Sequence, residues 1–400
     1  MDKLPWLVLN EILFRLDRKA MARMRCTNKD FRRHMSEDPY FEREYKSILF
    51  PISNHKLSFG DLRSQVLGCC SGLLLLFVEE LFVVNAITWK YRLVNYSWSR
   101  LMANMFSSGV IDPEKLVRIG FVVDEVDPNT QRFKIICLIE AKEEEEARTK
   151  YQFEVTSGDS FWTLSKTTIT CHSSKLVEGM RPVYLNQVLY WLRNDGSIIT
   201  FNTVTEEAQL LQTELLPNSR TLFCMAPGLT LLAATEEGVY VYALENTFKW
   251  VLVRRIPNEI VLKDPRKRMM SWKVAAYDGK FIVLTETTKD VMVVHEYDLR
   301  ANKWQIIQSF SNCNTSEEFF QLRPSSSSVI GLNNLIGMEN KLLLQMQPRT
   351  SELTKRLFLF LKDMFPRPMY IIDPLQFKLS LLSKKKLELT PIYNGPLVDY

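Results

Sequence analysis

The sequence of 400 residues lacks the short motifs by which catalytic and metal sites are most easily recognised. Its four histidines are scattered, its seven cysteines form no CxxC or zinc-type spacing, and it has no glycine-rich phosphate loop. The serine of Gly68-Cys69-Cys70-Ser71-Gly72 is misplaced for the nucleophile motif of hydrolases, so these glycines indicate a tight turn into a strand. We therefore expect no catalytic residue, no metal site and no cofactor.

Neither charge nor hydrophobicity is concentrated along the chain. The 51 lysines and arginines nearly balance the 46 acidic residues, which disfavours a nucleic-acid or membrane partner. The longest apolar run, Gly72–Val78, is far too short to span a membrane. The first apolar run is broken by Asn10 and Glu11, so no secretory signal is expected. An odd number of irregularly spaced cysteines predicts reduced thiols, and hence a cytoplasmic and/or nuclear location.

Residues 4–45 predict four short helices. Leu4-Pro5 opens the first helix, because proline suits the first helical position. An apolar stripe then follows at helical spacing, formed by Leu9, Ile12, Leu13 and Leu16. Such a small module has a marginal core of its own. These apolar residues either pack only on each other, or some of them meet another protein or the rest of the chain.

The order of residues in this stretch resembles an F-box, especially the form found in large plant families. The resemblance rests on the Leu4-Pro5 start, the apolar helix, and the later residues Lys19, Arg23, Arg25, Cys26, Lys29, Phe31, Arg32, Asp38, Pro39 and Phe41. It implies docking on a Skp-type adaptor of a cullin–RING ubiquitin ligase, the SCF complex. The residues expected to bind the adaptor, or to shape the fold that presents it, are Leu4, Pro5, Leu9, Ile12, Leu13, Leu16, Met21 and Phe31.

From residue 68 onward a repeated plan predicts an all-β structure. Six units of similar order start near residues 72, 120, 187, 229, 279 and 340, each with apolar strands separated by turn residues such as Asp278-Gly279. The intervals fit propeller blades with loop insertions. A single blade cannot bury both of its faces, so blades stacked around an axis are the expected solution, most simply six of them. The competing interpretation is a pair of β-sandwiches.

Several elements of this region resemble the F-box-associated and Kelch-like propellers of plant proteins. They include Gly68–Leu74, Gly120-Phe121 with Phe133–Ile135, the Phe161-Trp162 element, and Tyr297-Asp298 with Trp304. The expected organisation is therefore an all-α F-box at 1–46, a connector at 47–67 and an all-β propeller at 68–400.

The resemblance implies a non-catalytic substrate-recognition subunit of an SCF-type ubiquitin ligase. The adaptor would bind the F-box, and an unknown protein target would bind the propeller. Two other functions remain open from the sequence. One is a propeller interaction protein whose F-box recruits no ligase. The other is a propeller enzyme such as a glycosidase, which requires carboxylates clustered at the propeller axis.

Overall fold

The computed structural model describes most of the region after the predicted F-box. The described residues are 48–50, 64–85, 90–107, 113–127, 130–143, 148–158, 161–213, 220–225, 228–235, 238–257, 271–277, 279–287, 291–311, 320–322, 328–334, 357 and 361. The chain divides into two units, Met1–Ile48 with Phe365–Tyr400, and Leu49–Met364. Almost all described residues belong to the second unit, and the predicted F-box lies outside them.

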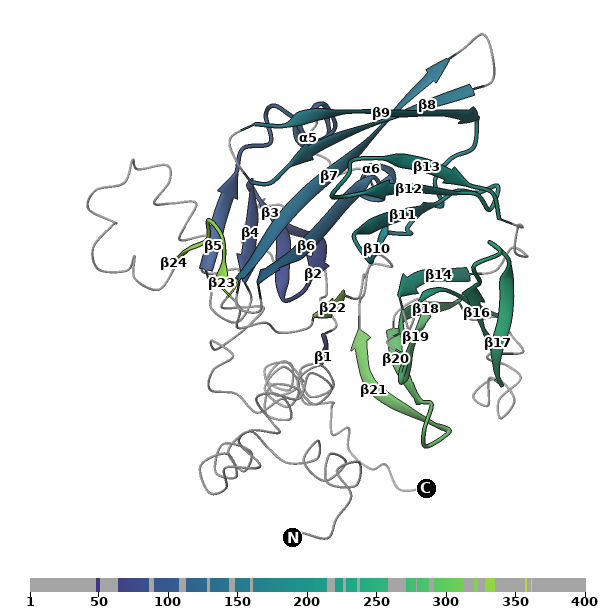
Figure 1. The fold of residues 1–400 in the computed structure, drawn as a ribbon. Coiled ribbons are helices and arrows are strands. Elements are labelled where there is room, and N and C mark those ends of the chain that lie inside the picture. Colours follow the sequence, from purple (N-terminus) through teal and green to yellow (C-terminus); the bar gives the residue numbers. More distant parts are fainter. Residues whose placement is uncertain are drawn as a thin grey trace, which may run out of the picture. The chain divides into compact units, whose positions relative to one another are not determined.

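Five units of four consecutive antiparallel strands follow one another along the chain, and we call them blades one to five (Figure 1). Blade one contains β2 (Ser64–Cys70), β3 (Leu73–Val78), β4 (Glu80–Asn85) and β5 (Lys90–Val94). Blade two contains β6 (Ile119–Asp127), β7 (Thr130–Glu143), β8 (Arg148–Thr156) and β9 (Thr163–His172). Blade three contains β10 (Val183–Leu185), β11 (Val188–Leu192), β12 (Ile198–Asn202) and β13 (Ala208–Leu211). Blade four contains β14 (Arg220–Met225), β15 (Leu229–Ala234), β16 (Gly238–Leu244) and β17 (Trp250–Pro257). Blade five contains β18 (Ser271–Tyr277), β19 (Phe281–Thr287), β20 (Val291–Asp298) and β21 (Lys303–Ser311).

The middle strands of the blades are buried on both faces. Every residue of β3 and of β15 is buried, and most of β4, β12 and β19 are buried as well. Successive side chains of a strand point to opposite faces of its sheet. Each blade must therefore be covered on both sides by other parts of the chain.

Neighbouring blades supply this cover. One apolar cluster joins Leu75 of blade one to Phe133 of blade two, and further clusters join blades two and three, three and four, and four and five. Between blades two and three, the rings of Phe153 and Phe201 stack with centroids 4.6 Å apart. Four-stranded sheets that pack face to face in chain order define a β-propeller. The propeller interpretation is thereby confirmed over the alternative of two sandwiches.

The first strand of each blade lies against the first strand of the next, in the order β2, β6, β10, β14 and β18. Gly68 of β2 occupies a point of close approach, because a Cβ atom there would lie 2.8 Å from the Cβ atom of Phe121 on β6. The turn from β2 to β3 needs positive φ at Ser71 (44°) and Gly72 (82°), which confirms the tight turn expected there.

After blade five the chain returns to blades one and two. The strand β22 (Phe320–Leu322) pairs with β1 (Ile48–Phe50) and also contacts β2. The strand β23 (Ser328–Val329) runs parallel to the start of β7, and β24 (Asn333–Asn334) pairs with β5. These short strands fasten the later part of the chain to its first two blades.

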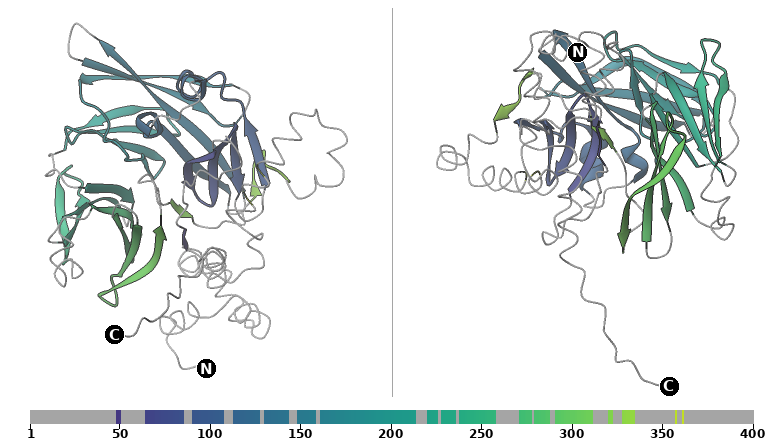
Figure 2. Two further views of the ribbon diagram at one scale, coloured as in Figure 1. Left: turned by 180° about the vertical axis from the view of Figure 1, so that it is seen from behind. Right: turned by 90° about the horizontal axis from the view of Figure 1, so that it is seen from below.

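Two short helices connect blade one to blade two. Helix α5 (Arg100–Ser107) packs Leu101, Met102 and Met105 into the apolar cluster between the two blades, and α6 (Pro113–Leu116) follows. The left view of Figure 2 shows α5 as a coil beside the long strands of blade two, seen from behind. Among the described residues, no helix has the length and apolar character needed to cross a membrane.

The structure corrects one detail of the sequence prediction. The described residues form five blades rather than six, and the predicted sixth unit, which starts near residue 340, lies outside them. Asn186 and Gln187, at the start of the third predicted unit, form a turn with positive φ between β10 and β11. A two-residue turn of this kind favours asparagine at its first central position, and that signal predicts a hairpin here.

We expect Gly68→Ala to destabilise the propeller. The new methyl group meets the Cβ atom of Phe121, which is fixed to the backbone of β6 and cannot rotate away. The cost should be about 1–3 kcal/mol, seen as a fall of several degrees in the midpoint of thermal unfolding. Gly228→Ala is the control, because nothing lies within 4 Å of a Cβ atom at that position. Equal midpoints for the two variants would show that β2 and β6 do not approach so closely.

Candidate interaction surface

The residues predicted to bind the adaptor lie outside the described part of the structure. They are Leu4, Pro5, Leu9, Ile12, Leu13, Leu16, Met21 and Phe31. Their roles therefore remain predictions from the sequence. The structure bears instead on the second half of the expected function, which is the surface of the propeller that could hold a target.

Two aromatic side chains project into solvent beside each other where blade one meets blade two. Trp98 and Phe161 are 65% and 69% exposed, and their ring centroids are 6.4 Å apart with an interplanar angle of 59°. Leu164, at the start of β9, is 51% exposed. It pairs with Glu154, which contacts the two residues directly after Trp98. We call Trp98, Phe161 and Leu164 the aromatic surface.

The segment that carries Trp98 is held by its own hydrogen bonds. The Asn95 side chain accepts a hydrogen bond from the Ser97 backbone at 3.0 Å, and the Ser99 N–H donates to the Tyr96 carbonyl at 3.0 Å. Ser99 then caps helix α5, because its hydroxyl accepts from the Met102 N–H at 3.2 Å. Trp98 is thus placed on a defined turn between a strand and a capped helix.

Glu154 ties this turn to blade two. Its buried carboxylate accepts hydrogen bonds from the Ser99 hydroxyl at 2.9 Å, and from the Arg100 backbone N–H and side-chain Nε at 3.0 and 2.8 Å. A carboxylate is favoured at this place because the first N–H groups of a helix carry partial positive charge. The negative charge of Glu154 is therefore neutralised by the helix end and by Arg100.

The segment that carries Phe161 is fixed to the same turn. The indole Nε1 of Trp162 donates to the Asn95 carbonyl at 2.7 Å. On the other side of a short gap in the described residues, Gly158 has φ of 80° and sits on the ring of Phe133, where a Cβ atom would lie 2.3 Å from Cζ. Only glycine tolerates both the positive φ and the close contact with the ring. Two loops far apart in sequence are thus joined under the aromatic surface.

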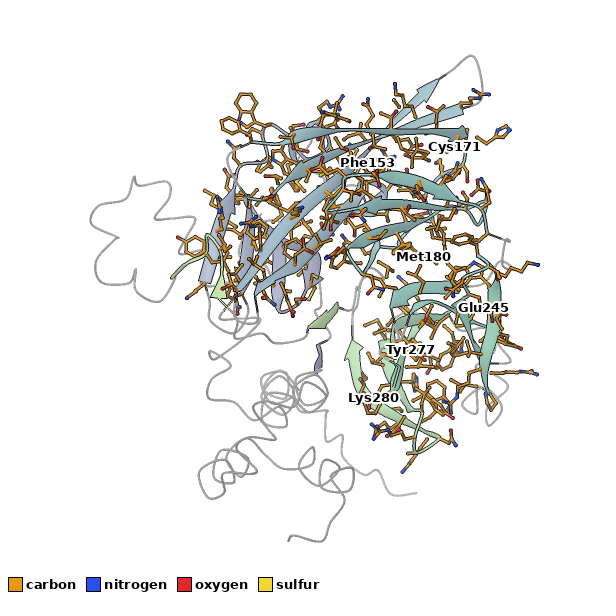
Figure 3. All side chains as sticks on the ribbon, in the orientation of Figure 1. Phe153, Cys171, Met180, Glu245, Tyr277 and Lys280 are labelled. Atoms are coloured by element: carbon orange, nitrogen blue, oxygen red, sulfur yellow. The ribbon has the colours of Figure 1, made fainter. Side chains whose placement is uncertain are left out.

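A basic and hydroxyl-rich face continues from the aromatic surface along β9. Alternate residues of β9 point outward and are exposed, namely Leu164, Lys166, Thr168, Thr170 and His172. The opposite, inward side of β9 bonds to blade three, where Ser165 and Thr167 donate to the Glu206 carbonyl. Figure 3 shows Cys171 near the far end of β9, and Phe153 within the packed region between blades two and three.

Burial determines the protonation state of the thiol that lies beside the hydrogen bonds of Glu154. Cys137 on β7 is fully buried, and desolvation raises the pKa of its thiol far above the ordinary value. The nearby charge of Glu154 raises this pKa further, while a hydrogen bond with Ser99 opposes the change. Cys137 therefore remains a protonated, apolar core residue and offers no reactive thiolate at neutral pH.

The inner strands give little support to the enzymatic interpretation. Among the described inner strands, acidic residues occur only on β6, as Asp124, Glu125 and Asp127. Asp124 accepts a hydrogen bond from the hydroxyl of Tyr184 on β10, and burial together with this bond raises the pKa of Tyr184. The described residues include no group of three or more potential metal ligands. We find here no pair of facing carboxylates from different blades.

Sequence reasoning missed the aromatic surface. Phe161 was assigned only to a family-like strand element, and Trp98 received no role at all. Large aromatic residues are usually buried, so composition alone predicts core positions for them. The available signal was local: Asn95, Ser97 and Ser99 predict a turn and a helix cap around Trp98, which keeps that residue off a strand or helix face.

Comparison with known proteins shows which family model and which relatives this chain matches. The family model described as the F-box domain matches residues 1–43. A putative F-box protein of Arabidopsis thaliana is 40% identical over 371 residues, which cover 83% of this chain and 87% of that protein. Two putative F-box/kelch-repeat proteins of the same plant are 40% and 34% identical, over 83% and 81% of this chain and 79% and 88% of their own lengths.

An F-box followed by a β-propeller defines a class of F-box adaptor proteins. With relatives of this identity and coverage, the chain belongs to the family of plant F-box and F-box/kelch-repeat proteins. F-box domains generally bind Skp-type adaptors of cullin–RING ligases, and ubiquitin ligase involvement is the usual role of such proteins.

We expect Glu154→Ala to loosen the turn that presents Trp98. The change removes the acceptor of three hydrogen bonds from Ser99 and Arg100. The free energy of unfolding should fall by about 2–4 kcal/mol, as for other broken buried charge networks. Glu154→Gln should cost less, because it keeps the volume and one acceptor oxygen.

Thermal unfolding followed by circular dichroism measures both variants of Glu154. The control is Glu178→Ala, since Glu178 is exposed. If Glu154→Ala and Glu178→Ala unfolded at the same temperature, the carboxylate of Glu154 would not be joining the two blades.

Proposed function

We propose that this protein is the substrate-recognition subunit of an SCF-type E3 ubiquitin ligase. The F-box at residues 1–43 binds a Skp-type adaptor, and the propeller binds a target protein. The observation that supports this most directly is the pairing of an F-box with a propeller in one chain, shared with relatives that match over about four fifths of it.

The propeller suits the receptor role because its blades form a rigid scaffold. The middle strands are buried on both faces, while the loops and outer strands are free to vary in sequence without disturbing the core. Such a receptor performs no chemistry itself. It raises the effective concentration of target lysines near the ubiquitin-loaded enzyme, since both are held in one assembly.

The apolar stripe of the first helix is the proposed adaptor contact. Leu9, Ile12, Leu13 and Leu16 lie on one face at helical spacing, and a small helical module leaves part of such a face uncovered. We also propose a cytoplasmic and/or nuclear location, on the pattern of cysteines alone.

We expect the full chain to co-purify with a Skp-type adaptor when the two are expressed together, and Leu13→Asp to abolish the complex. A carboxylate in an apolar interface loses its hydration without gaining a partner, which should lower the affinity at least tenfold. The matched control is Leu252→Asp, because Leu252 is a 49% exposed leucine of the outer strand β17. Gel filtration of the co-expressed pair is the measurement.

The same co-purification experiment distinguishes this proposal from the alternative function. If the unchanged chain formed no complex with any Skp-type adaptor, the protein would be a propeller interaction protein whose F-box does not recruit a ligase. The unfolding midpoint of the propeller should be the same in Leu13→Asp and in the unchanged chain. A fall in that midpoint would mean that the substitution acts beyond the F-box.

A further inference from the structure

The aromatic surface has the properties of a protein-binding site. Trp98, Phe161 and Leu164 expose large apolar side chains next to one another, whereas single exposed apolar residues are ordinary on any protein. Tryptophan and other aromatic residues dominate the binding energy of protein interfaces, since they contribute a large contact area for few rotatable bonds.

The surface is also arranged in advance. Hydrogen bonds within residues 95–99, the Ser99 cap, the Glu154 network and the Trp162–Asn95 bond hold both loops in place. A binding surface whose backbone is already ordered loses little conformational entropy when a partner arrives. These contacts distinguish the surface from a mobile loop that happens to carry apolar residues.

The charges beside the surface identify the kind of partner. On the outward face of β8 and β9, next to Leu164, lie the side chains of Lys166, Lys150 and Arg148, with Gln152 and the threonines of β9 between them. Arg100 also reaches this face, because its Nη2 donates to Gln152 at 3.4 Å. A face with this excess of cations attracts an acidic segment.

The acidic groups near this face do not cancel its charge. The Glu154 carboxylate is buried and already bound by Ser99 and Arg100. Glu143 lies opposite Arg148 in the strand register, at the end of the face that is farthest from the aromatic surface. The other acidic residues close in sequence, Glu144, Glu145, Glu146 and Asp159, lie outside the described residues. Lys166 and Lys150 are therefore the cations left for a ligand.

We propose that the aromatic surface and the adjoining face of β8 and β9 bind an acidic segment of the target protein that carries an aromatic or aliphatic anchor residue. The anchor packs on Trp98 and Phe161, while neighbouring aspartates or glutamates meet Lys166 and Lys150. The identity of the partner as a target rests on the proposed function. The recognition itself depends only on residues of the propeller.

The other exposed apolar stretch of the described residues, on the outer strand β17, is a weaker candidate. Leu252 and Val253 are 49% and 63% exposed, but Val253 lies at a β-bulge and two arginines follow it. Bulges and charged residues are the usual means by which an edge strand avoids pairing with other chains. Arg254 and Arg255 are also engaged, with Asn302 and with the ring of Tyr240. This strand therefore supplies the control variants.

Selection of peptides from a random 12-residue library on the immobilised full chain tests the proposal. Binding of the selected peptides is then measured by fluorescence anisotropy with purified proteins. The variants are Trp98→Ala/Phe161→Ala and Lys166→Glu. Their controls are Leu252→Ala/Val253→Ala, at exposed apolar positions, and Lys273→Glu, at an exposed lysine of β18.

We expect selected peptides to combine an aromatic or aliphatic residue with aspartate or glutamate. Their Kd should rise at least tenfold in Trp98→Ala/Phe161→Ala and about threefold to tenfold in Lys166→Glu, and it should rise with salt concentration. Both control variants should bind as the unchanged chain does. The unfolding midpoint should be the same in Trp98→Ala/Phe161→Ala and in the unchanged chain, as exposed side chains predict.

Several results would overturn the proposal. The proposal would be wrong if the selected peptides still bound Trp98→Ala/Phe161→Ala, or if they lacked acidic residues. It would also be wrong if the β17 control variant lost binding to the same extent. A lowered unfolding midpoint would show that the rings pack on the chain itself. A dimer in sedimentation that only this double variant dissociates would assign the surface to a second copy. Adaptor co-purification, measured on the same variants, reports separately on the proposed function and should not change.

Discussion

Burial of both faces of the middle strands is the constraint on which the rest of this structure depends. An isolated four-stranded sheet would leave the side chains of β3 or β15 open to water on at least one side. Packing blade against blade removes that exposure, and four apolar clusters of the described residues accordingly lie between neighbouring blades. Stability is thus shared along the ring, so a change at one blade boundary acts on two sheets.

The same constraint separates the residues that packing fixes from the residues that are available for recognition. Glycine at position 68 and the buried strands are set by packing, and they allow little variation. Segments that leave the blades, such as residues 95–99, are bound by local hydrogen bonds and by a few contacts such as those of Glu154. These contacts support exposed side chains without burying them. A propeller can in this way present different surfaces on a constant framework.

Much of the architecture could be predicted from the sequence. Alternating apolar residues and turn signals located the second, third and fourth strands of the blades, and the resemblance to plant F-box proteins identified the class. The inner strands β2, β14 and β18 were missed, although Trp272 and Val274 of Ser271–Tyr277 alternate with polar residues as a half-buried strand requires. The sixth predicted blade rested on strand pattern alone, and the described residues account for five.

The interaction surface could not be predicted, for a different physical reason. Exposure of Trp98 and Phe161 results from contacts between residues about fifty-five apart in the sequence, above all those of Glu154 with Ser99 and Arg100. Charge balance over the whole chain, at a net +5, likewise hides the local excess of cations on the outward face of β8 and β9. Averages along the sequence lose such features, because they arise only when distant segments meet.

The return of the chain to its first two blades has a consequence for biosynthesis. The outer edge of blade one is completed by β24, and the start of β7 gains its parallel partner from β23. Both strands leave the ribosome after all five blades have been translated. The F-box emerges first, so a nascent chain can expose its docking module while the first blade still has an open edge. Premature termination before residue 328 would leave that edge permanently unpaired, which is the state most prone to aggregation.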